Sequence, residues 1–145
     1  MRDNNSRTVK RVLLLGYGKI GRTIHDMLLP TGRYEVLIGE ASPEMVREAT
    51  SRGLKAVILD VADSGALAAA LQGQDIAINA LPHQFVAPVA VAAAEQNVHY
   101  FDLTEDVVTT RHIKTLAQHA QTVLMPQCGL APGFISIAAY DLIRH

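Results

Sequence analysis

Hydrophobic and polar positions divide the chain into two kinds of segment that follow one another. Short apolar runs, such as the Val-Leu-Leu-Leu stretch at 12–15, are typical of parallel strands buried on both faces. Between these runs, apolar residues return at the spacing of amphipathic helices. The pattern predicts strands at 11–15, 34–39, 56–59, 75–79, 99–102 and 122–125, and helices at 19–29, 44–52, 64–71, 85–96 and 107–118.

Regular alternation of strands and helices predicts an α/β fold with one parallel sheet and right-handed crossovers. We expect residues 9–133 to form this domain, preceded by a polar, disordered tail at 1–8. The segment 134–145 continues with apolar residues at helical spacing and contains no stop signal after them. We interpret this segment as the first helix of a truncated second domain.

The first predicted strand ends in three glycines at the spacing G-x-G-x-x-G. Gly16 allows a tight turn, Gly18 lets a pyrophosphate approach the backbone, and Gly21 lets the next helix pack closely. The amides at the start of that helix favour an anion. The pattern predicts a doubly wound Rossmann domain with six strands in the order 3-2-1-4-5-6. Its first cofactor contacts are expected from Gly16, Tyr17, Gly18, Lys19, Ile20 and Gly21.

Glu40 ends the second predicted strand, close to the position expected for the acid that binds the adenosine ribose. A carboxylate there accepts hydrogen bonds from the ribose hydroxyls and repels the 2′-phosphate of NADP. The three residues that follow Glu40 include no arginine to receive that phosphate. The sequence therefore favours NAD, with NADP as the alternative. A different role for Glu40, capping the helix that begins near Ser42 and Pro43, is compatible with ribose binding.

The ends of the third, fourth and fifth strands supply the other candidate residues, because ligands bind beyond the carboxyl edge of such sheets. Asp60 can accept a hydrogen bond from the adenine amino group, or merely begin a loop. Acidic residues at 102, 105 and 106 are expected mainly to cap the next helix. His83 is the one histidine at a carboxyl end and a weak catalytic candidate, and the catalytic residues stay unknown. The expected cofactor contacts in this region are Asp60, Val61, Asn79, Ala80, Leu81 and Pro82.

Composition narrows the classes of protein to be considered. A net charge of −1 gives no basic face, so we expect no nucleic-acid partner. Apolar stretches stay well short of a membrane span, and the polar start does not resemble a signal peptide. One cysteine, Cys128, fits a reducing cytoplasm. The histidines lack metal-ligand spacing with a supporting Cys or acid, so no metal is expected.

Four motifs together resemble the NAD(P)-binding domain of the saccharopine dehydrogenase family. They are Gly-Tyr-Gly-Lys-Ile-Gly at 16–21, Asn-Ala-Leu-Pro at 79–82, Tyr-Phe-Asp-Leu-Thr-Glu at 100–105 and Cys-Gly-Leu-Ala-Pro-Gly at 128–133. The resemblance runs from about Val9 onward. It implies hydride transfer between NAD(P) and the carbon–nitrogen bond of an amino acid such as lysine or saccharopine. It also implies that the nicotinamide half is held near Leu81 and Pro82 and by Gly129, Leu130, Ala131 and Pro132.

Members of this family continue into a second domain, which supplies most of the substrate site and the contacts of a homodimer. One departure concerns Ala131, because some saccharopine-type reductases carry an Asp there. This departure leaves related amino-acid dehydrogenases open. Two alternatives to an oxidoreductase are a stand-alone NAD(H)-binding sensor without catalysis and a Rossmann-like methyltransferase. The glycine spacing fits a pyrophosphate and disfavours the methyltransferase.

Overall fold

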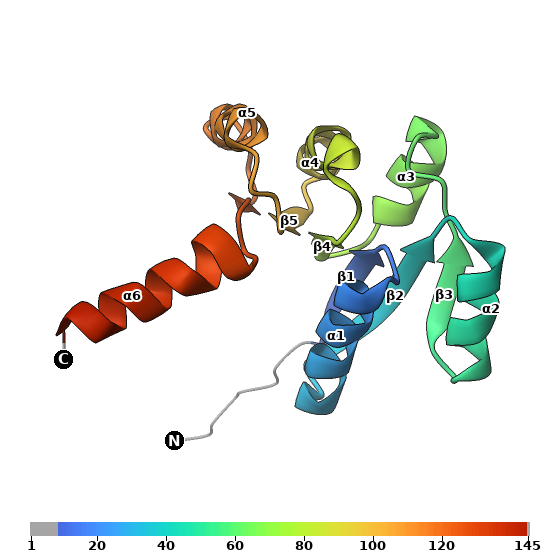
Figure 1. The fold of residues 1–145 in the computed structure, drawn as a ribbon. Helices are drawn as coiled ribbons and strands as arrows, with labels where there is room; N and C mark the ends of the chain where they lie inside the picture. Colours follow the sequence, from blue (N-terminus) through green and yellow to red (C-terminus); the bar gives the residue numbers. More distant parts are fainter. Residues whose placement is uncertain (1–8, 145) are drawn as a thin grey trace, which may run out of the picture.

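The computed structural model describes residues 9–144 and contains a sheet of six strands flanked by helices (Figure 1). The strand order is β3-β2-β1-β4-β5-β6, and every neighbouring pair is parallel. The predicted topology is therefore confirmed. The strands are β1 (Lys10–Leu15), β2 (Tyr34–Glu40), β3 (Lys55–Ile58), β4 (Ile76–Asn79), β5 (His99–Asp102) and β6 (Leu124–Met125).

The helices follow the predicted pattern, with ends shifted by a residue. They are α1 (Lys19–Leu28), α2 (Pro43–Ser51), α3 (Ser64–Leu71), α4 (Val86–Glu95), α5 (Val107–Ala117) and α6 (Ile135–Arg144). Three short turns of helix were not predicted: η1 (Leu29–Thr31), η2 (His83–Phe85) and η3 (Leu130–Phe134). The last of these is interrupted at Ala131, whose backbone is extended (φ −132°, ψ 125°). The expected tail at 1–8 lies outside the described residues, as does His145.

Two apolar cores lie on opposite faces of the sheet, because side chains alternate between the faces of each strand. Leu13 and Leu15 of β1 join the larger core, which includes buried residues of α3, α4 and α5. Val12 and Leu14 of the same strand join the smaller core, against α1 and α2. This placement of helices on both faces, visible in Figure 1, leaves the carboxyl edge of the sheet accessible to a ligand.

The helices that follow β2, β3 and β5 begin at side-chain caps. The Ser42 hydroxyl accepts a hydrogen bond from Met45 N, and the Asp63 carboxylate accepts bonds from the first turn of α3. Asp106 Oδ2 accepts one from Thr109 N at 2.6 Å, which confirms the expected capping of α5. By contrast, α1 begins at Gly18 with no side-chain cap. The first-turn amides of α1 are therefore available to an external anion.

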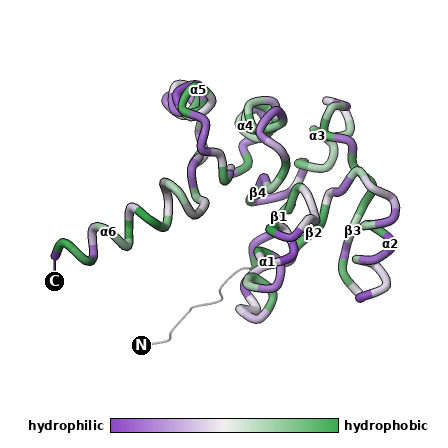
Figure 2. Tube along the Cα trace, viewed as in Figure 1, coloured by the Kyte–Doolittle hydropathy of each residue, from purple (hydrophilic) through white to green (hydrophobic). Residues whose placement is uncertain are grey.

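Helix α6 extends away from the sheet, toward the left of Figure 1. Hydrophobic positions recur along its whole length (Figure 2). Its large apolar side chains are all exposed, with Leu142 79% and Ile143 83% accessible. The predicted helix is therefore present. Within the described residues 9–134, no other element buries the apolar stripe of α6.

Candidate dinucleotide-binding site

The glycine loop joins β1 to α1 and has the steric properties that the motif requires. Gly16 adopts a positive φ of 90°, a conformation that side chains rarely adopt. A Cβ on Gly21 would lie 2.0 Å from the Gly16 carbonyl oxygen, so any side chain there would displace the turn. A Cβ on Gly18 would meet no atom within 4 Å apart from those of its neighbours in the chain. Gly18 therefore borders open space beside the uncapped start of α1.

Glu40 joins the end of β2 to the glycine loop. Its Oε2 accepts a hydrogen bond from Tyr17 N at 2.9 Å, and its Oε1 accepts one from Ser42 N at 3.0 Å. Ser42 is the N-cap of α2, and Glu40 accepts a hydrogen bond from the backbone amide of this cap residue just before the helix begins. A carboxylate offers about four acceptor positions, so two remain for a ligand. Glu40 is thus held beside Gly18 with acceptor capacity to spare.

Tyr17 requires a correction to the expected set of contacts. Its side chain is fully buried in the smaller core, so its ring is not available to a cofactor. Arg52 Nη1 donates to the Tyr17 hydroxyl at 3.0 Å, and the Arg22 guanidinium lies 4.9 Å from the ring centroid. Arg22 also pairs with Glu48, and this hydrogen bond raises the pKa of Arg22. These contacts hold Tyr17, and with it the glycine loop, against the smaller core.

The loop that follows β3 carries Asp60 and Val61. Asp60 is exposed, and its Oδ1 accepts a hydrogen bond from Ala62 N at 2.9 Å, as in an ordinary loop start. Val61 is buried and lines a groove of about 350 Å³ between α3 and α4. Gln84 and Phe85 border the same groove. Asp60 and Val61 follow β3, the edge strand next to β2, and the adenosine end of a dinucleotide is expected at this end of the sheet.

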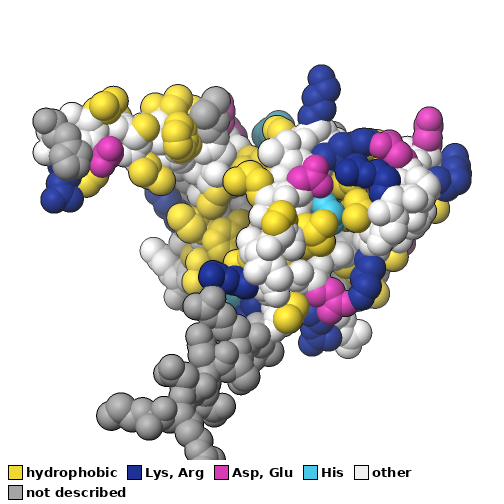
Figure 3. Space-filling model, turned by 90° about the horizontal axis from the view of Figure 1, so that it is seen from below, with side chains coloured by type: hydrophobic (Ala, Val, Ile, Leu, Met, Phe, Trp, Pro, Cys, Tyr) yellow, Lys and Arg dark blue, Asp and Glu magenta, His cyan; other side chains and the backbone are white. Residues whose placement is uncertain are grey.

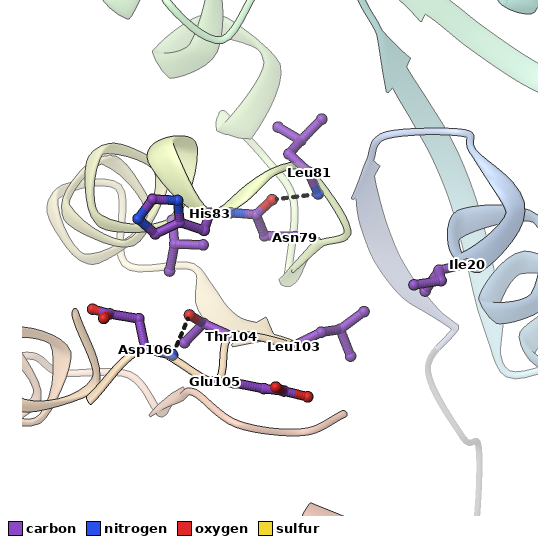
Figure 4. A pocket seen from close by; sticks show the side chains of 9 residues that line it. Ile20, Asn79, Leu81, His83, Leu103, Thr104, Glu105 and Asp106 are labelled. Atoms are coloured by element: carbon purple, nitrogen blue, oxygen red, sulfur yellow. Dashed lines mark hydrogen bonds between the residues drawn. The ribbon is translucent and has the colours of Figure 1, made fainter. Parts of the chain in front are cut away.

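A cavity of about 340 Å³ opens between the segments that follow β4 and β5, beside the switch point between β1 and β4 where the chain order reverses. Figure 4 shows Asn79, Leu81 and His83 on one wall, residues 103–106 on a second, and Ile20 of α1 across from them. Three expected contacts, Ile20, Asn79 and Leu81, thus meet in one place. The lining residues absent from the predicted set are His83, Val86, Leu103, Thr104, Glu105 and Asp106.

The remaining expected contacts lie behind or beside this cavity. Ala80 packs on the glycine loop, because a Cβ added to Gly16 would lie 3.1 Å from the carbonyl oxygen of Ala80. Pro82 and Lys19 are exposed at the edge. Gly129 lies against the loop after β5, where a Cβ would be 3.3 Å from Leu103 O. Ala131 lies in η3 and does not line the cavity, and the side chains of Leu130 and Pro132 are outside the described part.

Charge in the cavity is predominantly negative. Glu105 and Asp106 line it, and none of its lining residues is Lys or Arg. The Thr109 hydroxyl and amide lower the pKa of Asp106, and His83 adds a smaller effect in the same direction. Nearby, burial raises the pKa of the Cys128 thiol, so the thiol keeps its proton near neutral pH. The cavity therefore suits a ligand that is neutral or positively charged.

Within residues 9–144, no group of three His, Cys, Asp or Glu side chains could hold a metal ion. In the same range, no helix combines the length and hydrophobicity needed to cross a membrane. The candidate site consists of the glycine loop, Glu40 and the cavity beside the switch point. These features define a Rossmann domain of the class that binds dinucleotides.

Comparison with known proteins identifies the family. Residues 12–125 match the model of the saccharopine dehydrogenase NADP binding domain, so the chain belongs to this family. A saccharopine dehydrogenase [NADP(+), L-glutamate-forming] from Pyricularia oryzae is 28% identical over 139 residues. That alignment covers 94% of this chain and 30% of the relative. The domain resemblance inferred from the motifs is thereby confirmed, and NAD(P) is the cofactor class of the domain.

Solved structures agree with this assignment. Saccharopine dehydrogenase (L-Glu forming) from Saccharomyces cerevisiae superposes with a TM-score of 0.83 at 26% identity, covering 93% of this chain and 31% of that one. The TrkA-N domain of an Escherichia coli inner membrane protein has a TM-score of 0.68 at 24% identity, with 93% and 96% covered. The second similarity shows the fold alone. The chain thus spans about a third of the saccharopine dehydrogenases that it matches.

Proposed function

We propose that this domain holds NAD(H) across the carboxyl edge of its sheet and serves as the cofactor-binding part of an amino-acid oxidoreductase. The pyrophosphate lies at Gly18 and the start of α1, and the adenosine ribose lies at Glu40. The adenine lies toward Asp60 and Val61, and the nicotinamide lies toward the cavity at the switch point. This arrangement follows the general rule for doubly wound sheets.

The observation that carries the proposal is the open space at Gly18 beside an uncapped helix. Apart from its neighbours in the chain, no residue places an atom within 4 Å of a Gly18 Cβ, whereas Gly16 and Gly21 are tightly packed. The same loop is held by the Glu40 carboxylate, a ribose acceptor. A cradle with free amides on one side and a carboxylate on the other matches the pyrophosphate and ribose of a dinucleotide.

The chemistry that a bound nicotinamide supplies is hydride transfer. The residues of this chain bind and orient the ring and exclude water from it. Ile20, Leu81 and Leu103 offer apolar contact to the ring within the cavity. Because Glu105 and Asp106 make the cavity negative, a protonated amine is the substrate group that fits beside it. This charge supports the C–N bond of an amino acid as the reacting group.

The substrate is a lysine- or saccharopine-type amino acid by analogy with the names of the relatives, which are saccharopine dehydrogenases. Helix α6 is the element that would contact a substrate domain, because its apolar side chains are exposed. Dimer contacts would lie on that domain as well. The alternative of a stand-alone sensor is less favoured, because the family model covers most of the chain and belongs to an enzyme family.

Glu40 supports NAD as the preferred form, in contrast to the NADP(+) in the name of the relative from Pyricularia oryzae. A 2′-phosphate on the adenosine ribose would lie beside a carboxylate that is fixed by two backbone amides. Two arginines that contact Tyr17 of the glycine loop are already engaged: Arg22 pairs with Glu48, and Arg52 donates to the Tyr17 hydroxyl. Relocating either arginine to bind a phosphate would break these contacts.

Calorimetric titration of NADH and NADPH into the domain tests the proposal. We expect micromolar NADH binding, weaker NADPH binding and no turnover by this chain alone. Gly18→Ala should melt at the temperature of the wild type, because its Cβ meets open space. The same Cβ should weaken NADH binding at least tenfold, which corresponds to roughly 1.4 kcal/mol. Absence of binding to either nucleotide contradicts the cofactor site, and a preference for NADPH contradicts only the interpretation of Glu40.

A further inference from the structure

Asp102 is the last residue of β5 and lies at the carboxyl edge of the sheet. It is only 1% exposed, so its carboxylate is buried. Asn79 of β4 lies opposite Asp102 in the register of the sheet and is equally buried. Buried carboxylates are costly unless hydrogen bonds satisfy them. The bonds that Asp102 makes therefore indicate why a charged residue occupies this position.

Asp102 joins two loops that are distant in sequence. Its Oδ1 accepts hydrogen bonds from Thr104 N at 2.8 Å and from Gln127 N at 3.3 Å. Its backbone oxygen accepts a third bond, from Cys128 N at 2.8 Å. One residue thus fixes the start of the β5–α5 loop and the chain that leaves β6. A shift of Asp102 would move both loops together.

The first of these loops forms a wall of the cavity at the switch point. Thr104 lines the cavity, and its hydroxyl oxygen accepts a hydrogen bond from Asp106 N at 3.2 Å (Figure 4). The opposite wall is held in a similar way, because Asn79 Oδ1 accepts a bond from Leu81 N at 3.0 Å. Each wall of the cavity is therefore held by a buried polar side chain at the end of a strand.

The second oxygen of Asp102 indicates that stability alone does not explain the residue. Oδ2 is buried and has no hydrogen-bond partner among the described residues. The neighbouring Tyr100 hydroxyl donates to Val86 O at 3.2 Å and accepts from Asn79 Nδ2. Burial, and then the charge of Asp102, raise the pKa of Tyr100, so this hydroxyl stays protonated. A carboxylate with one unsatisfied oxygen stabilises a fold poorly.

We propose that Asp102 is a positioning residue: it holds the two loops in the arrangement that receives the nicotinamide ring. This inference rests on the proposed function, because it assigns a contact region to one end of the dinucleotide. Asp102 itself is too deeply buried to touch the ring. Its effect passes through Leu103 and Thr104, which line the cavity.

The test compares two ligands, NADH and ADP-ribose, which differ by the nicotinamide ring. Calorimetry on the wild type should give tighter binding of NADH than of ADP-ribose. Asp102→Ala should weaken NADH about tenfold and leave the affinity for ADP-ribose within twofold. Asp102→Asn retains the acceptor for Thr104 N and places an amide donor where Oδ2 has no partner. It should therefore bind NADH like the wild type.

Asp75→Ala is the matched control. Asp75 Oδ2 accepts a hydrogen bond from Arg11 N at 2.8 Å, but at the amino edge of the sheet, away from the cavity. This variant should leave both affinities unchanged. If Asp102→Ala does not fold, Asp102→Ser, which has a shorter polar side chain, is interpreted in the same way.

Three results would overturn the inference. The first is equal weakening of both ligands in Asp102→Ala, as expected of a merely structural residue. The second is no weakening of either ligand. The third is a wild type that binds NADH and ADP-ribose equally, because no contact with the ring would then exist to be positioned. A wild type that binds neither ligand contradicts the proposed function instead, so the two failures are distinguishable.

Discussion

The two faces of the sheet differ in how far their cores extend. On the side of α3, α4 and α5, the core continues from β1 through Ala77 and Tyr100 to Leu124 of β6. On the side of α1 and α2, the core stops at β4, where Ile76 and Ile78 are only partly buried. Met125 of β6, which faces this second side, is 52% exposed.

This difference separates the apolar surface that the domain covers by itself from the apolar surface that it leaves exposed. Figure 3 shows hydrophobic side chains along α6 and in the hollow between α6 and the rest of the domain. Parallel sheets normally have helices on both faces, because both faces carry apolar side chains. The half of the sheet that holds the glycine loop satisfies this rule, and the β5–β6 half satisfies it on one side only.

A large loss of stability is expected from Gly21→Ala, in the fully packed half. The new Cβ would lie 2.0 Å from Gly16 O, so α1 must move away from the end of β1. Overpacking of this kind costs about 3 kcal/mol. Urea denaturation should show this loss, and calorimetry should show no NADH binding. Gly18→Ala is the control for stability, because it adds the same methyl group to the same loop in open space and should denature like the wild type. A wild-type midpoint for Gly21→Ala would contradict the close packing of the loop.

A pair of neighbouring substitutions in β6 tests the comparison of the two faces directly. Leu124 is 7% exposed and packs in the larger core, so Leu124→Ala should cost about 2 kcal/mol. Met125→Ala removes a side chain from the uncovered face and should change stability by less than about 0.5 kcal/mol. Equal losses in urea denaturation would mean that the second face is covered in solution.

Much of the fold follows from the sequence, because periodicity depends on local physics. Apolar runs and helical spacing predicted each strand and long helix, and the alternation of the two predicted the strand order. The least accurate strand was β6, predicted from 122 but assigned only at Leu124–Met125, although Val123 O still accepts a hydrogen bond from Tyr100 N of β5 at 2.8 Å. An edge strand has one neighbour, so its length depends on tertiary pairing that the local pattern does not contain.

The candidate site was predicted less completely than the fold. The glycine roles and the position of Glu40 follow from spacing along one stretch of chain. The burial of Tyr17 depends on Arg52, which is 35 residues away in sequence. The bond from Gln127 N to Asp102 joins positions 25 residues apart. Contacts of this kind arise when separate loops meet at the carboxyl edge, and no single motif specifies them.

Acid should weaken the covered face of the β5–β6 half through Asp106, the cap of α5. Hydrogen bonds from Thr109 lower the pKa of Asp106, so the folded state binds this proton less readily than the unfolded state. The stabilisation is therefore complete above the unfolded pKa, near 3.9, and disappears as the pH falls through the lower folded pKa. Asp106→Ala should melt below the wild type at pH 7, and the gap should narrow below about pH 4. A gap that is independent of pH would mean that the charge of Asp106 contributes nothing to the cap.

The sharpest contrast between regions is expected for two isoleucines, one of which should barely affect stability when it is replaced. Ile113 of α5 is fully buried, and Ile143 of α6 is 83% exposed. Ile113→Glu places a charge in the core and should unfold the domain. Ile143→Glu should change the free energy of unfolding by less than about 0.5 kcal/mol, because its side chain already contacts water.

Exposed apolar side chains on a helix favour association. Ile143→Glu should therefore reduce both the self-association seen by analytical ultracentrifugation and the binding of a hydrophobic dye. A loss of stability comparable to that of Ile113→Glu would show that α6 packs on the domain in solution, and the uncovered face of β5 and β6 is the surface on which it would lie.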